Sequence, residues 1–389
     1  MSTANLNVDA VVTPEKIAQL QEQIAEQSPD WVPAKRQWHY EATRDTIRHW
    51  AWGIGDDNPL FCDLAYGRTT KFGTNLAPGT FLYSAASGPM HENSAGARKE
   101  GKGGPLGGIH AVWVKDEWAW ERPIVQGMST LCTAGKIVEA IPRESKFGGL
   151  SVTVVTEQRF TNQHGEPLGS RRVSFMHFGR STAKGRGKYA DIKRYVWTDE
   201  ELERLVADID LERVRGATDL VWDDVAVGEQ IPHVVKGPLS GSEIVCFWQG
   251  WGGTYRAASE ITHKYFRKHP KANVPDRISR FPEFPGRVHI DSEFARECGF
   301  PEAYDLGAQR GSWAASAVTN WMGDNGHLKN FSFQLHRLNI IGDATWITGK
   351  VTAKRVDSDG QRVIDLELSG RNQHGVETIT ALATVVPPR

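Results

Sequence analysis

Residues 53–67 read GIGDDNPLFCDLAYG, and the interpretation of the whole chain depends on this stretch. Asp56 and Asp57 stand in a glycine-framed turn before Asn58 and Pro59. An aspartate in such a turn can accept hydrogen bonds from backbone N–H groups, while a proline fixes the next bend. The same aspartate could instead be a catalytic acid, which would need a basic partner. A structural and a catalytic role for Asp56 are therefore both open.

The turn lies in a sequence pattern that occurs twice. FTNQHGEPLGSRRVSF at 160–175 is similar to GRNQHGVETITALATV at 370–385, and VQGMSTLCTAGKIVEA is similar to IIGDATWITGKVTAKR upstream of them. IRHWAWGIGD, which enters the turn, lines up with IVCFWQGWGG. Because the matches keep their order in both halves, we infer two copies of one fold.

Each copy has the same expected elements. A short helix such as 43–52 runs into the turn, and a longer helix follows the APG or DLG segment. SVTVVTEQRF and QRVIDLELSG alternate apolar and polar residues, as half-buried strands do. The two NQHG elements are typical of hairpin turns, which favours a turn over a catalytic role for His164 and His374. A helix followed by antiparallel strands predicts an α+β unit with the helix laid on a curled sheet.

These residues together resemble the MaoC-like dehydratase and (R)-specific enoyl-CoA hydratase family. Its motif reads roughly G-D-x-N-P-x-H-x-D, followed by a segment whose last glycine opens the central helix. GDDNPLFCD and LAPGTF match this pattern in the first copy, and HIDSEFARECGFPEAYDLG matches its rear in the second. The resemblance implies a double hotdog, in which each of two tandem units has a central helix wrapped by an antiparallel sheet.

The resemblance and the changes of composition predict the domain boundaries. The expected parts are a helical extension at 1–34, an N-terminal hotdog at 35–180, a linker at 181–217, and a C-terminal hotdog at 218–389 with an insert at 254–286. The linker changes from glycine-rich and basic to acidic, and TDEELERL in it begins a helix with a threonine cap. The N-terminal unit would form the acyl pocket, and the C-terminal unit would hold the chemistry.

The family's chemistry assigns roles to two kinds of residue. An Asp and a His together activate the water that adds to a double bond beside a thioester. Negative charge then builds on the thioester oxygen, where a backbone N–H at the start of the central helix can stabilise it. Gly79 and Gly307 are the candidates for this position. A plain helix-entry glycine is the alternative for both.

Each copy departs from the motif. The first copy keeps Asp56, but Phe61 stands in place of the histidine and cannot transfer a proton. The resemblance therefore makes Phe61 a pocket residue. In the second copy His289 stands in the histidine position, while Gly253 aligns with Asp56. We expect His289 to be catalytic.

The carboxylate partner of His289 is left open by the sequence. Glu283 lies six residues before it and is the first choice. Glu260, from the insert, and Asp56, from the other copy, are the alternatives. Asp291 completes the rear of the motif and is expected at the substrate.

Cationic residues are candidates for binding coenzyme A. Arg310, on the first turn of the second central helix, is expected at the substrate. The basic residues of the insert and of AKGRGK at 183–188 could hold the phosphates, or could belong to solvated loops. The insert is expected to form a helix ending before Pro270 and then a proline-rich loop.

Composition narrows the functional classes. Lys plus Arg number 46 and Asp plus Glu 47, a balance that argues against nucleic-acid binding. Four cysteines without CxxC spacing predict neither a zinc site nor disulfides, and no signal peptide or membrane span is evident, so we expect a cytoplasmic protein.

The leading hypothesis is a lyase, a hydratase or dehydratase acting on an acyl-CoA thioester. It would need no metal and no cofactor beyond the CoA of its substrate, and a homodimer is plausible. The alternatives are a non-catalytic acyl-CoA-binding subunit, because both copies break the Asp/His pair, and a hotdog thioesterase.

Overall fold

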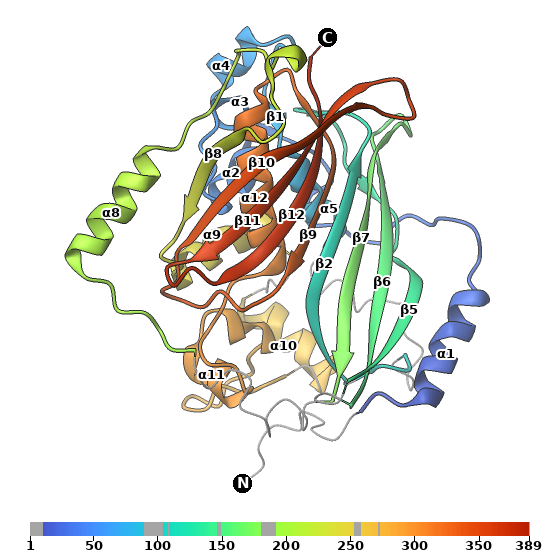
Figure 1. Ribbon diagram of the computed structural model, residues 1–389. Coiled ribbons are helices and arrows are strands. Elements are labelled where there is room, and N and C mark those ends of the chain that lie inside the picture. The colour runs from blue at the N-terminus through green and yellow to red at the C-terminus, as the bar shows by residue number, and fades with distance from the viewer. Residues whose placement is uncertain are drawn as a thin grey trace.

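A computed structural model describes residues 11–88, 104–107, 109–145, 149–179, 192–252, 258–270 and 273–388. Ten strands form one antiparallel sheet that curves around the long helix α12 (Figure 1). The expected α+β architecture of two tandem units, each with a helix and a wrapped antiparallel sheet, is confirmed.

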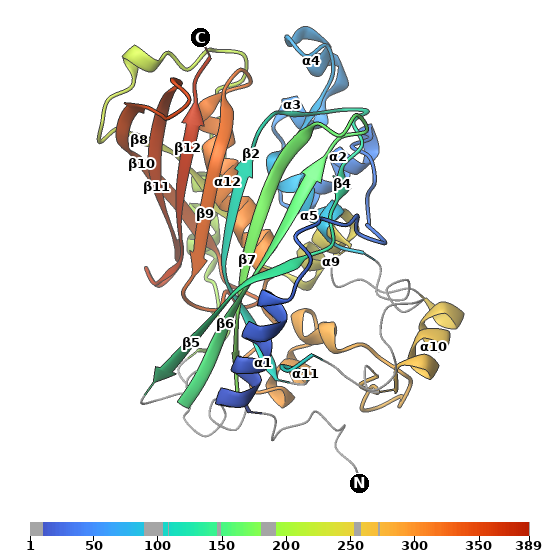
Figure 2. The same cartoon turned by 90° about the vertical axis from the view of Figure 1, so that its right-hand side faces the viewer.

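The sheet is continuous through both units. Its order is β4-β6-β7-β2-β9-β12-β11-β10-β8, with β5 paired to β6. The N-terminal unit contributes β2 (His110–Trp120), β4 (Leu131–Cys132), β5 (Lys136–Ser145), β6 (Gly149–Thr161) and β7 (Pro167–Phe178). The C-terminal unit contributes β8 (Gln230–Lys236), β9 (His327–Leu335), β10 (Thr345–Val356), β11 (Arg362–Asn372) and β12 (Glu377–Val386). The units meet where β2 lies beside β9 (Figure 2). In this antiparallel pair Glu117 is opposite Ser332.

The helices differ between the units. The N-terminal unit has α1 (Pro14–Ala25), α2 (Arg44–Gly53), α3 (Pro59–Cys62), α4 (Leu64–Thr69), the 3-10 turn η1 (Gly79–Phe81) and α5 (Leu82–Ala86), besides the short strands β1 (Leu76–Ala77) and β3 (Ile124–Val125). From the linker onward come α8 (Asp199–Asp210), η2 (Trp222–Asp224), α9 (Gly241–Trp251), α10 (Ser259–Lys268), η4 (Pro285–His289), α11 (Ser292–Glu297) and α12 (Gly307–Met322).

The expectation of a longer helix in both copies is wrong for the first. The second has α12, of 16 residues, whereas α5 has five. The backbone of Ser87 is already extended, and Gly88 and Pro89 follow it in the sequence. A proline lacks the N–H that a helix needs and disfavours helical backbone in the residue before it.

Matching contacts confirm the repeat. The two NQHG elements form the β6–β7 and β11–β12 hairpin turns, as expected. In the first, Gln163 Oε1 accepts a hydrogen bond from Ser129 N at 3.0 Å. In the second, Gln373 Oε1 accepts one from Ala344 N at 3.1 Å. Equivalent glutamines thus tie equivalent turns to equivalent backbone positions.

The extension, linker and insert surround this core. Ile17 and Leu20 of α1 pack with residues of β6 in a separate small core. Helix α8 has the expected threonine cap, in which Thr198 and Glu201 form a capping box, and it lies beside the C-terminal unit (Figure 1). Helix α10 ends at Lys268, before Pro270 as predicted. Of the helices described, none combines the length and apolar character needed to span a bilayer.

The two motif helices, α2 and α9, cross at glycines. A Cβ atom on Gly53 would lie 3.0 Å from Cys246 O, and one on Gly250 would lie 2.9 Å from His49 O. In the aligned repeats Gly53 corresponds to Gly250, and His49 corresponds to Cys246. The two helices therefore cross about an approximate twofold axis. The atoms nearest to an added Cβ belong to the backbone of the other helix, not to a movable side chain. An alanine at either position would therefore force the two helices apart.

We expect Gly53→Ala and Gly250→Ala each to lower the free energy of unfolding by about 1–3 kcal/mol, the usual cost of overpacking. Gly241→Ala is the control on α9, since nothing lies within 4 Å of its added Cβ. It should be neutral or slightly stabilising. Urea unfolding measures all three, and equal losses in the three variants would contradict the close crossing.

Candidate functional site

Asp56 holds the motif turn against the other unit. Its side chain is buried, and Oδ1 accepts a hydrogen bond from Asn58 N at 3.0 Å. Oδ2 accepts one from Ser316 Oγ of α12 at 2.9 Å. Next to it, Asn58 Nδ2 donates to Asn320 Oδ1, also on α12, at 3.4 Å. The aspartate is therefore a crosslink between the first copy's turn and the second copy's central helix.

The surroundings of Asp56 have opposing effects on the pKa of its carboxyl group. Burial raises the pKa of its carboxyl, and the charge of Lys236 and hydrogen bonds from Asn58 and Ser316 act in the opposite direction. Lys236 Nζ itself donates to Gly55 O at 2.6 Å. Every one of these contacts fixes the turn, which favours the structural role for Asp56.

We expect Asp56→Ala to lower the free energy of unfolding by about 1–3 kcal/mol, because Asn58 N and Ser316 Oγ lose a buried acceptor. Asp57 is the matched control, since it is adjacent and exposed. Asp57→Ala should change stability by less than about 0.5 kcal/mol. Thermal and urea unfolding measure the stability of both variants. Similar decreases in the free energy of unfolding for Asp56→Ala and Asp57→Ala would contradict a stabilising role for the Asp56 hydrogen bonds.

A small cavity opens beside the motif turn. Its volume is about 50 Å³, and its wall includes Asn58, Phe61, Gly79, Trp120, Asp324 and His327. The first copy's motif and its helix-entry glycine therefore face one space, together with residues of the C-terminal unit from the end of α12 to the start of β9. We call this space the motif cavity.

Gly79 is needed for packing at the wall of this cavity. Trp120 Nε1 donates to Gly79 O at 3.1 Å, and a Cβ on Gly79 would lie 2.7 Å from Trp120 Cε2. The indole lies directly against the glycine backbone. This close packing alone explains why a glycine stands at position 79, and it does so independently of any role for Gly79 at a thioester.

The corresponding place in the second copy is filled. A Cβ on Gly307 would lie 2.8 Å from Trp113 Cδ2 and 3.2 Å from Leu335 Cδ1. Counted from the aligned VQG and IIG segments, Leu335 corresponds to Trp120, and Trp113 corresponds to Leu328 of the motif cavity wall. An indole therefore covers Gly307 where the first copy has a leucine.

His289 and its predicted neighbours are held in local contacts. His289 Nδ1 lies 2.8 Å from Tyr304 O, and the two rings are 4.6 Å apart. Glu283 Oε1 accepts a hydrogen bond from Phe284 N at 2.8 Å. Neither His289 nor Glu283 is part of the motif cavity wall.

Asp291 is a helix cap. Its Oδ1 accepts a hydrogen bond from Phe294 N at 2.9 Å, at the start of α11. Asp63 caps α4 in the same way at the equivalent position, with Oδ1 2.8 Å from Ala65 N. The equal spacing from Asp291 to Gly307 and from Asp63 to Gly79 therefore corresponds to a helix cap at the same position of each copy.

Arg310 has a buried position rather than one at a substrate pocket. Its Nε donates to Asp305 Oδ2 at 2.6 Å, and a second nitrogen approaches Asp305 Oδ1 at 2.5 Å. Nη1 donates to Arg337 O and Thr378 O. A guanidinium with protein acceptors on three sides is not placed to bind a phosphate.

Several basic candidates of the insert lie in surface ion pairs. Lys264 Nζ lies 2.5 Å from Glu260 Oε1, and both side chains are exposed. Glu260, the alternative carboxylate partner of His289, therefore faces solvent. Arg277 contacts Glu293 and Glu297. Gly253, Arg256, Lys271 and residues 183–188 are outside the described residues.

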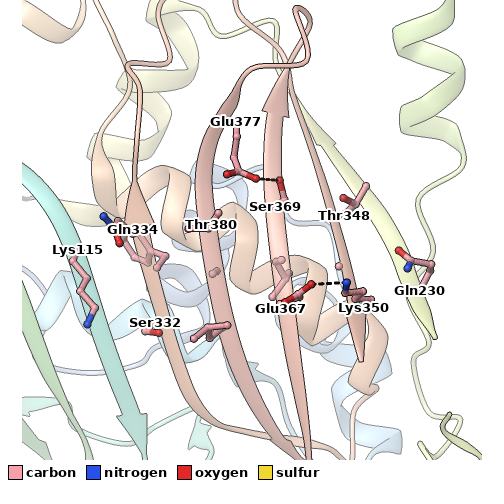
Figure 3. A pocket seen from close by; sticks show the side chains of 15 residues that line it. Lys115, Gln230, Ser332, Gln334, Thr348, Lys350, Glu367, Ser369, Glu377 and Thr380 are labelled. Atoms are coloured by element: carbon pink, nitrogen blue, oxygen red, sulfur yellow. Dashed lines mark hydrogen bonds and ion pairs between the residues drawn. The ribbon is translucent and has the colours of Figure 1, made fainter. Parts of the chain in front are cut away.

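A surface pocket of about 770 Å³ lies on the opposite face of the C-terminal sheet from α12 (Figure 3). Its wall mixes polar and apolar side chains and includes the Lys350–Glu367 ion pair at 2.7 Å and the Ser369–Glu377 hydrogen bond at 2.6 Å. It contains no residue of either motif. In the described ranges no group of three or more His, Cys, Asp or Glu is arranged for a metal ion.

Comparisons with known proteins bear on the family of the first unit and on the fold of the chain. Residues 32–171 match the family model of the FAS1-like dehydratase domain region. A search of the curated proteins gives no match.

Solved structures match most of the chain. A MaoC-like dehydratase aligns with a TM-score of 0.63 and 16% identity, over 94% of this chain and 100% of that chain. A MaoC-like dehydratase from Phytophthora capsici aligns with a TM-score of 0.53 and 11% identity, over 94% of this chain and 97% of that chain. RV0216 from Mycobacterium tuberculosis, described as having a double hotdog fold, aligns with a TM-score of 0.51 and 10% identity, over 94% of this chain and 98% of that chain.

The chain has a double hotdog fold. The resemblance to MaoC-like dehydratases that the sequence suggested is confirmed, in the fold of both units and in the dehydratase-region match of the first. The titratable residues of the C-terminal unit in the motif cavity wall, Asp324 and His327, are not identified by the sequence motifs, because they lie far beyond the first copy's motif in the chain.

Proposed function

We propose that the protein is a hydratase or dehydratase acting on an acyl-CoA thioester, adding water to or removing it from the bond beside the thioester carbonyl. The observation that carries the proposal is the motif cavity, where Asn58 and Phe61 of the hydratase-like motif face Gly79 across one space. The dehydratase-region match over the same part of the chain supports it.

The size of the cavity suits the reacting water rather than the whole substrate. Pockets for drug-sized ligands occupy about 300–1,000 Å³, far more than this space. The thioester would enter by displacing side chains of the wall. Its oxygen would then lie near the N–H of Gly79, where a fixed donor stabilises developing negative charge better than mobile water does.

Chemistry at the first copy accounts for the geometry better than chemistry around His289. The second copy's equivalent glycine, Gly307, is covered by Trp113. His289 is bonded through Nδ1 to the carbonyl of Tyr304, outside the motif cavity. We therefore place the reaction at the first motif and regard His289 as a residue that orders its loop.

The native protein should remove the conjugated double bond of a trans-2-enoyl-CoA without releasing thiol. Short, long, branched and aromatic acyl groups should be tried, with the loss of enoyl-thioester absorbance as the measurement. The reverse reaction from 3-hydroxyacyl-CoA checks the direction. Binding of these thioesters without turnover would select the acyl-CoA-binding subunit, and thiol release from saturated acyl-CoA would select the thioesterase.

The location of the chemistry has its own test. His289→Ala should retain kcat/KM within about twofold, because His289 makes no contact with transition-state charge in this assignment. A variant that remains folded but loses activity by orders of magnitude would return the reaction to the C-terminal unit. Thermal unfolding of His289→Ala separates lost chemistry from lost structure.

A further inference from the structure

The C-terminal unit contributes two titratable side chains to the motif cavity. Asp324 follows the end of α12, and His327 begins β9. Both line the same space as Phe61 and Gly79. The position where a motif histidine would stand is thus occupied by Phe61, while an acid and a histidine reach the cavity from the other copy.

Asp324 has an unused buried acceptor. Its side chain is 3% exposed, and Oδ2 accepts a hydrogen bond from the Tyr66 hydroxyl at 2.6 Å. Oδ1 is buried and has no hydrogen-bond partner among the residues described. A buried carboxylate oxygen without a donor is costly, so water or a ligand is expected to supply one.

The hydrogen bond of His327 fixes its tautomer. Its Nε2 lies 3.0 Å from Trp120 O, a carbonyl that can only accept. Nε2 therefore carries the hydrogen, and in the neutral ring Nδ1 is the basic nitrogen. Burial lowers the pKa of His327, which keeps the imidazole neutral near pH 7. A neutral ring with a basic nitrogen can act as a general base.

We propose that Asp324 and His327 are the proton-transfer pair of the motif cavity, in place of the histidine that Phe61 replaces. This inference rests on the proposed hydratase function and specifies its catalytic residues. The site is then composite: the first copy supplies Gly79 and the pocket wall, and the second supplies the acid–base groups.

The hydration step balances with these two groups. Asp324 Oδ1 accepts one hydrogen of the water and orients it, and His327 Nδ1 removes the other. The water oxygen bonds to C3 of the enoyl thioester, and the C2=C3 π electrons pass to C2 and the thioester oxygen. The imidazolium then returns a proton to C2, so both residues end in their starting states. Dehydration is the reverse sequence.

Variants that preserve the observed hydrogen bonds test the pair. His327→Gln can still donate an amide hydrogen to Trp120 O, and Asp324→Asn can still accept from Tyr66. In the full-length protein each should lower kcat for the best enoyl-CoA by about a hundredfold or more, the range of general acid–base catalysis, with little change in KM. His336→Gln is the control, because this exposed residue lies just beyond β9 and bonds to Thr380.

A pH profile distinguishes proton transfer from structural support. The charged groups near His327 are Glu121 and Lys329, which act on it in opposite directions, and Asp324 and Arg122 of the cavity wall. The ascending, low-pH limb of the native kcat/KM profile should disappear in His327→Gln. A profile of unchanged shape, merely scaled down, would contradict a base role for His327.

The outcomes separate the two proposals. Native turnover that persists in folded His327→Gln and Asp324→Asn overturns the pair and leaves the hydratase function in place. An absence of native turnover with every enoyl-CoA overturns both. If either variant unfolds, Tyr66→Phe removes only the hydroxyl that orients Asp324. It should lower kcat by about tenfold with KM unchanged, and full activity would contradict the assignment.

Discussion

The antiparallel register between β2 and β9 is the constraint on which the rest of the structure depends. Glu117 opposite Ser332 sets this register, and everything along the two strands follows from it. The beginning of β9 is placed beside the end of β2, so His327 reaches the carbonyl of Trp120. The beginning of β2 is likewise placed beside the end of β9, so Trp113 lies with Leu335 against Gly307. One strand pairing thus builds the neighbourhood of both helix-entry glycines.

The same register gives unequal results because the side chains differ. At one end Leu328 and His327 leave a cavity beside Gly79, while at the other Trp113 fills the space beside Gly307. A buried void loses dispersion contacts, so a second empty site would lower stability without contributing chemistry. Filling it with an indole is consistent with a chain that uses one site only.

The fold was predictable from the sequence because its signals are local or repeated. Alternation along β6 and β11, the NQHG turns, the Thr198 cap and the end of α10 before Pro270 each depend on a few adjacent residues. The short α5 was missed, although the Gly88-Pro89 pair that follows it was visible in the sequence. The prediction of a longer helix there relied on the similarity of the two copies, although the proline after Gly88 indicated a helix end.

The candidate site was less predictable because its geometry is not local. Asp56 bonds to Ser316, 260 positions away, and Tyr66 bonds to Asp324, 258 positions away. Spacing within a motif cannot reveal such partners. Phe61 and Gly79, both taken from the first copy's motif, line one cavity, whereas Asp291, expected at the substrate, caps α11.

A single chain with two copies can separate roles that a symmetric pair cannot. In a twofold assembly of identical subunits each substitution appears at both equivalent sites. Here Phe61 and His289 occupy equivalent motif positions, and Leu328 and Trp113 equivalent wall positions, yet each pair has diverged. Once His327 and Asp324 reach the first cavity from the second unit, the motif histidine of the first copy is no longer required there. The loss at Phe61 is then compatible with an active site, provided the β2–β9 register is kept.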